Sequence, residues 1–239
     1  MAIVDKVRAH WPIDEDNDSI GEDVHSTWDL TDRNSLTSAT GKVGNCGDFN
    51  AYNQENIYAG SDDDFYDLQD GFGFSVWFKT EDTFDSHTRR LLTKRNQYEV
   101  YRTSGSYGAP DLKIKLNPAS GNFVTTLISG LASGTWYFLY WGCDGSNIKH
   151  SVNGATLTIG GAISDYNTSS YKFEIGNQSG TGLTRRFWNS LIDEVTYWGE
   201  MLTQDEIETV YNSGAGLAYP FTSSSAQPID YYLRHLGGA

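Results

Sequence analysis

Short runs of alternating apolar and polar residues, separated by turns rich in Gly, Asn and Asp, extend over residues 11–221. In the clearest run, Phe72 to Lys79, every second side chain is apolar, which places these side chains on one face of a strand. Asp144-Gly145 and Asn153-Gly154 end two further runs, and these dipeptides tolerate the positive φ of tight hairpin turns. Because nothing resembling a linker interrupts the pattern, it predicts one continuous all-β domain.

The number of short runs favours two stacked antiparallel sheets over a small barrel. The other predicted strands span residues 42–50, 55–59, 88–94, 97–102, 111–116, 122–128, 135–143, 147–152, 155–160, 171–176 and 187–198. One short helix is expected at Thr203 to Asn212, where Thr203 and Glu206 have the spacing of a capping box. Gly214 is expected to end it.

Charge and composition exclude several classes of function. With 17 Lys and Arg against 31 Asp and Glu, the net charge is −14, so the chain repels phosphate backbones and anionic membrane surfaces. No apolar run reaches the roughly 20 residues of a membrane helix, and the first residues lack the apolar stretch of a signal peptide. Cys46 and Cys143 have no framework spacing and are expected to be free, buried thiols.

Three motifs resemble laminin-G-like domains. These are TWYFLYWGCDGSNIKHSVNG, with its Trp strand and Asp-Gly turn, LIDEVTYWGEMLTQDEIETVYNSG near the end of the domain, and AHWPIDE followed by DSIGED near its start. The resemblance implies the concanavalin A-like jelly roll of the laminin-G and pentraxin kind: an all-β, two-sheet antiparallel sandwich with one short helix near the C-terminus. The resemblance covers about residues 7–221 and implies a binding or structural module, and we assign this domain to residues 1–221.

A calcium site is a second implication of this resemblance. Related jelly rolls often hold one structural Ca²⁺ between the N-terminal segment and the last strand, which points to Asp18, carbonyls near Gly21, and Asp193. The acidic cluster at 14–23 suits hard cations but does not match an EF-hand. Asp193 alternates with Glu194, so only one of the two is expected to be buried, with a cation as its partner. A solvated acidic loop, with Asp193 accepting backbone hydrogen bonds, is the alternative.

Candidate ligand residues lie in two loops. The segment TKRNQYEVY at 93–101 resembles a pentraxin ligand loop, but the matching second loop, at 175–180, lacks the carboxylates of the pentraxin phosphocholine site. Aromatic rings and amides beside loops leave sugar binding open, against packing in the core or at its rim. Arg186 could bind an acidic glycan or pair with a local carboxylate. The candidate ligand-binding residues are Asn96, Gln97, Tyr98, Asn177, Gln178, Arg186 and Trp188.

Catalysis is not expected. The sequence has no Gly-x-Ser-x-Gly elbow and no His-Glu-x-x-His pair. Related β-glucanases carry a Glu-x-Asp-x-x-Glu strand, which is absent here, and adjacent Asp193 and Glu194 should point to opposite faces. A β-glucan glycoside hydrolase is therefore the weakest alternative.

Residues 222–239 are predicted to be a flexible linker and a short amphipathic tail. After Pro228 the apolar residues recur at helical spacing on one face, which suits docking to the sandwich, a sister subunit or another protein. The candidate docking residues are Ile229, Tyr232, Leu233 and Leu236.

These features together predict a non-catalytic module for adhesion or structural attachment, which binds a glycan or a surface protein. Because the chain begins with Met and shows no export signal, we expect display on a virion surface, as a phage decoration, tail or fibre protein among other structural proteins. The alternative is a secreted, extracellular bacterial lectin-like domain that binds carbohydrate. Homo-oligomers are compatible with either.

Overall fold

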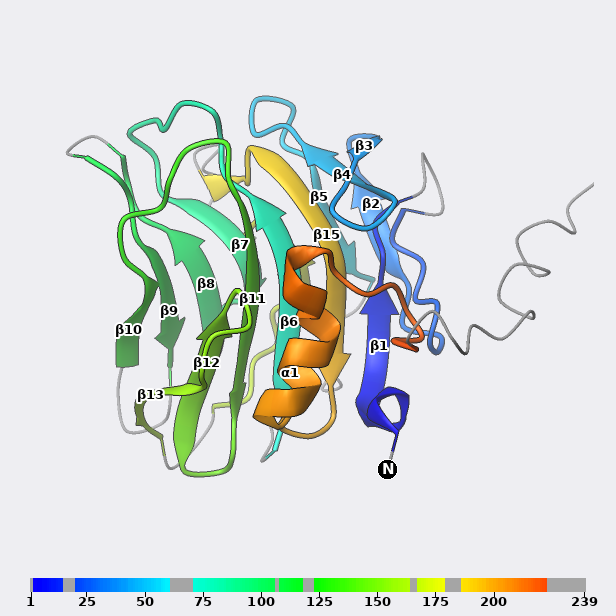
Figure 1. Ribbon diagram of the computed structural model, residues 1–239. Coiled ribbons are helices and arrows are strands. Elements are labelled where there is room, and N and C mark those ends of the chain that lie inside the picture. The colour runs from blue at the N-terminus through cyan, green and yellow to red at the C-terminus, as the bar shows by residue number, and fades with distance from the viewer. Residues whose placement is uncertain are drawn as a thin grey trace, which may run out of the picture.

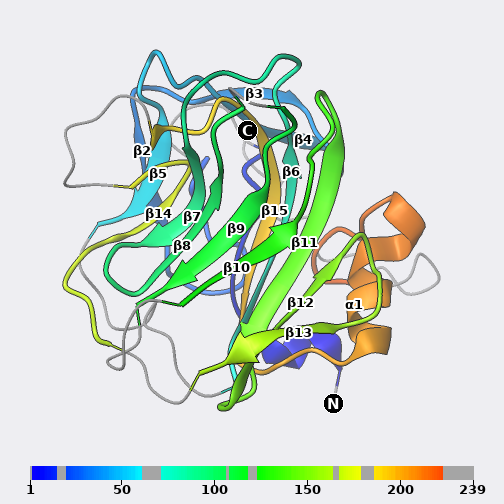
Figure 2. The ribbon, with the colours of Figure 1, turned by 90° about the vertical axis from the view of Figure 1, so that its left-hand side faces the viewer.

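In a computed structural model, which describes residues 2–14, 20–60, 71–105, 108–117, 123–163, 167–178 and 186–222, two antiparallel sheets stack face to face (Figures 1 and 2). Sheet A has the order β13 (Thr158–Ala162), β12 (Asn147–Val152), β11 (Trp136–Cys143), β6 (Gly73–Lys79), β15 (Ser190–Trp198), β4 (Asn45–Phe49) and β3 (Thr37–Thr40), with β1 (Val7–Trp11) paired to β15. Sheet B has the order β10 (Phe123–Ile128), β9 (Leu112–Leu116), β8 (Tyr98–Arg102), β7 (Arg89–Lys94), β14 (Phe173–Ile175), β5 (Asn56–Ala59) and β2 (Leu30–Arg33). The predicted two-sheet sandwich is confirmed.

Strands β2 and β3 are absent from the sequence prediction. Their sequences, LTDR and TSAT, are mostly polar, and β3 has no buried residue. Each strand lies at the edge of its sheet, where it pairs with only one neighbouring strand. A strand in this position does not need an apolar face. Backbone pairing, rather than apolar alternation, therefore defines these two strands.

Aromatic rings from both sheets meet in the core. Phe74 of β6 stacks on Tyr197 and Trp141 of its own sheet, with ring centroids 4.7 and 5.4 Å away. From sheet B, Phe173 and Tyr98 approach the same ring at 5.8 and 5.7 Å. All five side chains are at most 1% exposed. The alternation of β6 therefore places its apolar face in the core, as predicted.

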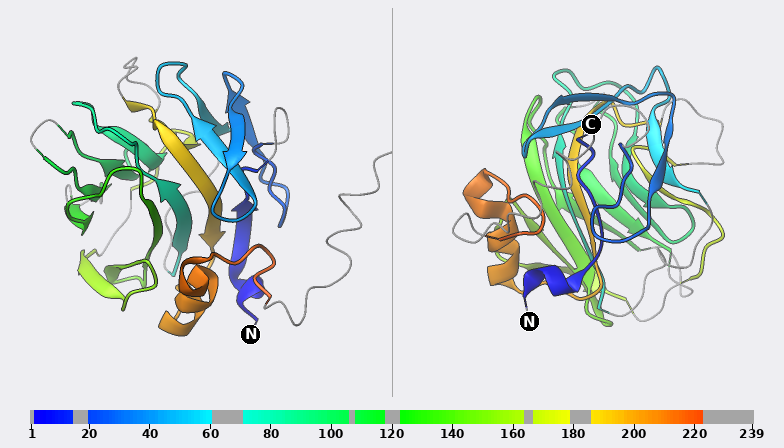
Figure 3. Two further views of the ribbon diagram at one scale, coloured as in Figure 1. Left: turned by 45° about the horizontal axis from the view of Figure 1, so that its top comes forward. Right: turned by 90° about the vertical axis from the view of Figure 1, so that its right-hand side faces the viewer.

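The opposite face of β6 is also buried. Trp77 is 2% exposed and packs with Phe138 and the helix residues Ile207 and Val210 in a second apolar cluster. Helix α1 (Gln204–Tyr211) lies outside the sandwich against sheet A (Figures 2 and 3), so this strand has no wet face.

Helix α1 begins at the predicted capping box but ends at a different residue from the one predicted. The Thr203 hydroxyl accepts from the Glu206 amide at 3.3 Å, and Glu206 Oε2 accepts from the Thr203 amide at 2.7 Å, which is the predicted capping box. The helix ends at Asn212, in the left-handed region with φ 49°, rather than through Gly214. Asn tolerates this conformation, and a 3₁₀ turn (Asn212–Gly214) follows. At the other terminus, Lys6 of η1 (Ile3–Lys6) bonds Glu206 at 2.8 Å.

Two predicted details are confirmed and others lie outside the described residues. The turns have positive φ at Asn153 (51°) and Gly145 (89°), and both cysteines are free and buried. Among the described residues, no helix is both long and apolar enough to cross a membrane. The predicted docking residues at 229–236 lie outside the described residues, as does Asp18.

Replacing Ile207 with Ala should lower the free energy of unfolding by about 2 to 5 kcal/mol, because it opens a cavity between α1 and sheet A. Thr209→Ala, on the exposed side of the same helix, should change it by less than about 1 kcal/mol. Urea denaturation of the two variants measures both values. Equal effects would contradict the packing of α1 on the sheet.

Candidate functional site

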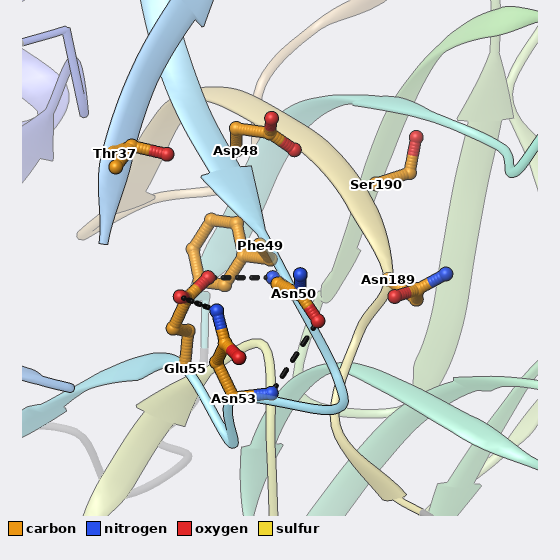
Figure 4. Close-up of a pocket in the computed structure, with 8 residues that line it drawn as sticks. All are labelled: Thr37, Asp48, Phe49, Asn50, Asn53, Glu55, Asn189 and Ser190. Carbon is orange, nitrogen blue, oxygen red and sulfur yellow. Dashed lines mark hydrogen bonds between the residues drawn. The ribbon is translucent and has the colours of Figure 1, made fainter. Parts of the chain in front are cut away.

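A polar pocket of about 230 Å³ opens where β3, β4 and β15 meet at one end of sheet A (Figure 4). Strand register builds it, since Thr37 pairs with Asp48 and Ser190 pairs with Phe49. The lining residues are Thr37, Asp48, Phe49, Asn50, Asn53, Glu55, Asn189 and Ser190. Apart from Phe49, every one of these side chains can form hydrogen bonds, so the pocket suits a hydroxyl-rich ligand.

The turn between β4 and β5 is held by its own side chains. Glu55, which is 4% exposed, accepts from the Asn50 amide at 2.7 Å and from Asn53 Nδ2 at 3.0 Å. Asn50 Oδ1 accepts from the backbone N–H groups of Tyr52 at 2.9 Å and Asn53 at 3.3 Å. Both oxygens of Glu55 thus accept hydrogen bonds within the turn, and the turn is preorganised.

Donors, acceptors and an aromatic ring remain free at this turn. Asn189 Oδ1 accepts from the Ala51 amide at 3.1 Å, which leaves its Nδ2 as a donor. Within the described chain, the Asp48 carboxylate and Asn50 Nδ2 make no hydrogen bond. Tyr52, in the same turn, is 83% exposed. This site was not predicted from the sequence, where its signal is a Tyr within the Asn-rich stretch NAYNQEN.

A pair of adjacent carboxylates is buried in β15. Asp193 is fully buried and Glu194 is 8% exposed, so the expectation that only one of them is buried is wrong. The cause is a bulge in the pairing with β6, where Glu194 adopts φ 51° and the strict alternation of the strand is lost.

Each carboxylate has one oxygen without a hydrogen-bond partner. Asp193 Oδ2 accepts from the amides of Lys42 at 2.7 Å and Val43 at 2.9 Å, whereas its Oδ1 has no partner. A Cβ at Gly41 would lie 2.6 Å from Asp193 Oδ2, so only glycine lets the turn close on this carboxylate. Glu194 Oε2 likewise lacks a hydrogen-bond partner.

Burial controls the protonation of these groups. It raises the pKa of Asp193 to about 8, with a further contribution from the charge of Glu194. Burial also raises the pKa of Glu194 well above its usual value, and Asp14 adds to this shift. His10 Nε2 lies 3.3 Å from Glu194 Oε2, but burial lowers the pKa of His10 to about 3, so it is neutral. With a pKa of about 8, Asp193 keeps its proton at neutral pH when no cation is bound.

The chemistry of the predicted calcium ligands fits this cluster in part. An unpaired, buried carboxylate oxygen on Asp193 is the hard donor that Ca²⁺ prefers. The Gly21 carbonyl already accepts from the Leu30 amide at 2.8 Å, although a carbonyl has a second lone pair. Asp23, in the same acidic segment, accepts from His10, His25 and Trp28 amides and organises its loop instead. Among the described residues, no preformed group of three His, Cys, Asp or Glu has metal-binding geometry.

Comparison with known families agrees with this architecture. Residues 53–208 match the profile of the laminin-G group described as the concanavalin A-like lectin/glucanases superfamily. The chain belongs to this superfamily. The resemblance seen in the sequence is thereby confirmed, while no curated protein matches the chain.

Solved structures share this fold at low sequence identity. Domain 4 of AbnA, a GH43 extracellular arabinanase from Geobacillus stearothermophilus solved with arabinotriose, has 20% identity and a TM-score of 0.65, over 88% of this chain and 98% of that one. The binding domain of Paraclostridial Mosquitocidal Protein 1 has 13% identity and a TM-score of 0.66, over 89% of this chain. The receptor-binding domain of botulinum neurotoxin mosaic serotype C/D has 12% identity and a TM-score of 0.61, over 88% of this chain. The chain spans about half of each toxin fragment, 53% and 51%.

Most of the predicted ligand residues of this superfamily member are buried. Tyr98 and Trp188 are 0% exposed, in the apolar core. Asn96 lies with Gln97 in the turn after β7, and Gln97 Nε2 donates to the Asn167 carbonyl at 2.7 Å. The described contacts of Tyr98, Gln97 and Trp188 lie within the domain, and their role in ligand binding stays a prediction.

The other three predicted ligand residues come together beside β7. Asn177 is 3% exposed and donates to Glu174 Oε2 at 3.0 Å. Gln178 Oε1 accepts a hydrogen bond from Arg186 Nη1. The Gly176 amide donates to the Leu91 carbonyl at 2.8 Å and the Asn177 carbonyl accepts from Thr93 Oγ1 at 2.6 Å, which places this segment beside β7.

The Asp193→Asn variant should change how stability depends on pH in metal-free buffer. Between about pH 4, where an unfolded Asp titrates, and the folded pKa of about 8, the folded state keeps a proton that the unfolded state loses. Asp193 therefore destabilises the fold progressively as the pH rises, and Asn, which still accepts from the 42–43 amides, does not. Between about pH 5 and about pH 8, the free energy of unfolding of the variant, measured by urea denaturation, should rise by at least about 1 kcal/mol relative to that of the wild type. A constant difference would contradict the raised pKa.

Proposed function

We propose that this chain is a non-catalytic module that binds glycans, with the pocket of β3, β4 and β15 and the ring of Tyr52 as its binding site. The observation that carries the proposal is an 83% exposed tyrosine in the turn that also builds a pocket of amide and hydroxyl groups. Aromatic faces stack on sugar rings, and amides select their hydroxyls. The preorganised turn reduces the entropy lost on binding.

The buried carboxylates support binding rather than hydrolysis. Glycosidases need two carboxyl groups that flank a bound sugar, about 5 to 10 Å apart. Asp193 and Glu194 are 0% and 8% exposed, so a polysaccharide cannot reach them. In the pocket, both oxygens of Glu55 accept hydrogen bonds that hold the turn, whereas Asp48 makes no hydrogen bond within the described chain. This arrangement favours ligand binding over the two-carboxylate chemistry of a glycosidase.

The solved structures with the same fold also support a binding function. One was crystallised with arabinotriose and is a domain of an arabinanase, and two are named as binding or receptor-binding domains. Because fold alone does not decide function, the proposal rests on the pocket, and these relatives suggest the first ligands to test.

We further propose that Ca²⁺ binds to Asp193, with Asp18 and the Gly21 carbonyl as its other ligands from the chain. The unpaired Asp193 Oδ1 and the negative potential of Asp14 and Glu194 support a cation at this place. The ion would supply charge neutralisation and would tie the N-terminal segment to β15.

The setting of the module stays the prediction made from the sequence. We propose the surface of a virus particle, where other structural proteins would be partners, with an extracellular lectin-like domain as the alternative. Glycan binding through an exposed pocket is compatible with both settings.

Tyr52→Ala should weaken binding of arabino-oligosaccharides, or of the best neutral ligand on a glycan array, by about fivefold, since a stacked ring contributes about 1 kcal/mol. Asn189→Ala should weaken it by removing an amide donor. Ile159→Ala, 63% exposed at the opposite edge of sheet A, is the matched control and should bind normally. Calorimetry gives the three affinities. The same glycans should release no reducing ends, and release that Asp48→Asn abolishes would show an enzyme instead.

Adding Ca²⁺ at about 100 times its Kd should stabilise the fold by about 2.7 kcal/mol, which corresponds to a rise in Tm of about 5 °C or more over EDTA. Asp193→Asn should abolish this rise. Asp144→Asn, in an exposed turn of β11 and β12, should retain it. Equal Tm values of the wild type in EDTA and in Ca²⁺ would exclude the site.

A further inference from the structure

The outward face of sheet B carries a cluster of cations within an acidic protein. Strand β8 places Val100 in the core, so its neighbours Glu99 and Tyr101 face outward. Arg90 of β7 pairs with Tyr101 in register, and Lys115 of β9 pairs with Glu99. The chain as a whole has a net charge of −14, so a group of positive side chains is unexpected here.

Arg90 is buried with part of its guanidinium unused. Its Nε and Nη2 each lie 3.0 Å from Glu99 Oε2, and the guanidinium carbon lies 4.7 Å from the centroid of the Tyr101 ring. The side chain is 9% exposed, and Nη1 is buried without a hydrogen-bond partner. A buried, unpaired N–H of a charged group is costly unless a ligand supplies the acceptor.

Arg186 adds a second guanidinium beside the same strand. Its Nη1 donates to Gln178, which follows the segment paired with Leu91, and the carbonyl of neighbouring Phe187 accepts from Arg89 of β7 at 3.0 Å. In the part of the chain that the structure describes, Arg186 has no carboxylate partner, so the salt bridge considered as its alternative role does not form.

Glu99 cannot neutralise this cluster by itself. Lys115 Nζ lies 3.9 Å from Glu99 Oε1, while Arg90 bonds Oε2, so one carboxylate already serves two cations. Burial lowers the pKa of Arg90, and the charge of Arg186 adds to this shift, whereas the charge of Glu99 opposes it. An added anion would relieve this repulsion.

We propose that Arg90 and Arg186 bind an oxyanion carried by an acidic glycan, with the Tyr101 ring beside it to pack against the sugar. A guanidinium presents parallel N–H donors that match a carboxylate or a sulfate ester, and two of them in a partly buried place bind the group more strongly than exposed charges do. This site uses side chains of sheet B and Arg186, none of which lines the pocket on sheet A, so it goes beyond the function proposed above and does not depend on it.

The test measures binding of the whole chain to polygalacturonate and to dextran sulfate, with neutral dextran as the uncharged probe, by calorimetry at low salt. The wild type should bind at least one polyanion, and preference between the two identifies carboxylate or sulfate as the group recognised. Arg186→Gln should weaken this binding about tenfold or more, since it removes a charge-assisted contact. Arg186→Lys keeps the positive charge but lacks the two parallel N–H donors of a guanidinium. Its affinity for the polyanion should lie between those of the wild type and Arg186→Gln.

Lys149→Gln is the matched control, because it removes one positive charge from a half-buried side chain of sheet A. It should bind the polyanions like the wild type. Arg90→Gln should also lose polyanion binding. If circular dichroism shows that this variant is unfolded, the result for Arg186→Gln alone tests the proposal. The proposal is overturned if the wild type binds neither polyanion, if Arg186→Gln binds as well as the wild type, or if Lys149→Gln loses as much. Tyr52→Ala should leave polyanion binding unchanged, so failure of the pocket is distinguishable from failure of this site.

Discussion

Ring packing around Phe74 joins the two sheets, and the other features of the structure are arranged around it. The ring contacts aromatic side chains of its own sheet, Tyr197 and Trp141, and of the opposing sheet, Phe173 and Tyr98. Buried aromatic side chains of this size contribute large areas of apolar burial and fix the spacing between sheets. With the interior filled in this way, polar chemistry is confined to turns, sheet ends and outward faces.

The two proposed binding sites follow this division. The pocket uses the end of sheet A and a turn that its own carboxylate holds, so its amides are positioned before any ligand arrives. The arginine pair uses the outward face of sheet B, where Tyr101 and Glu99 position Arg90. In both places a strand supplies the position, and a polar atom without a hydrogen-bond partner, such as Arg90 Nη1, supplies the chemistry.

Asp193 shows how such a fold carries a buried charge. Two backbone amides hold one oxygen, the other has no partner, and burial with Glu194 nearby raises its pKa. A protonated carboxylate and a bound cation are two solutions to the same electrostatic cost. The bulge breaks the alternation of β15 at these two residues, and both carboxylates are buried.

The sequence by itself determined the sandwich, the capped helix and the free thiols, because apolar alternation, the Thr203 capping box and turn dipeptides such as Asn153-Gly154 act over a few residues. Tertiary structure alone decided that both Asp193 and Glu194 are buried, since a bulge depends on the partner strand. It also decided which polar groups meet. Asn50 and Asn189 are far apart in sequence and line one pocket, while Tyr98, predicted as a ligand residue, fills the core. Alternation tells which side chains share a face, but the register between strands decides which of them become neighbours.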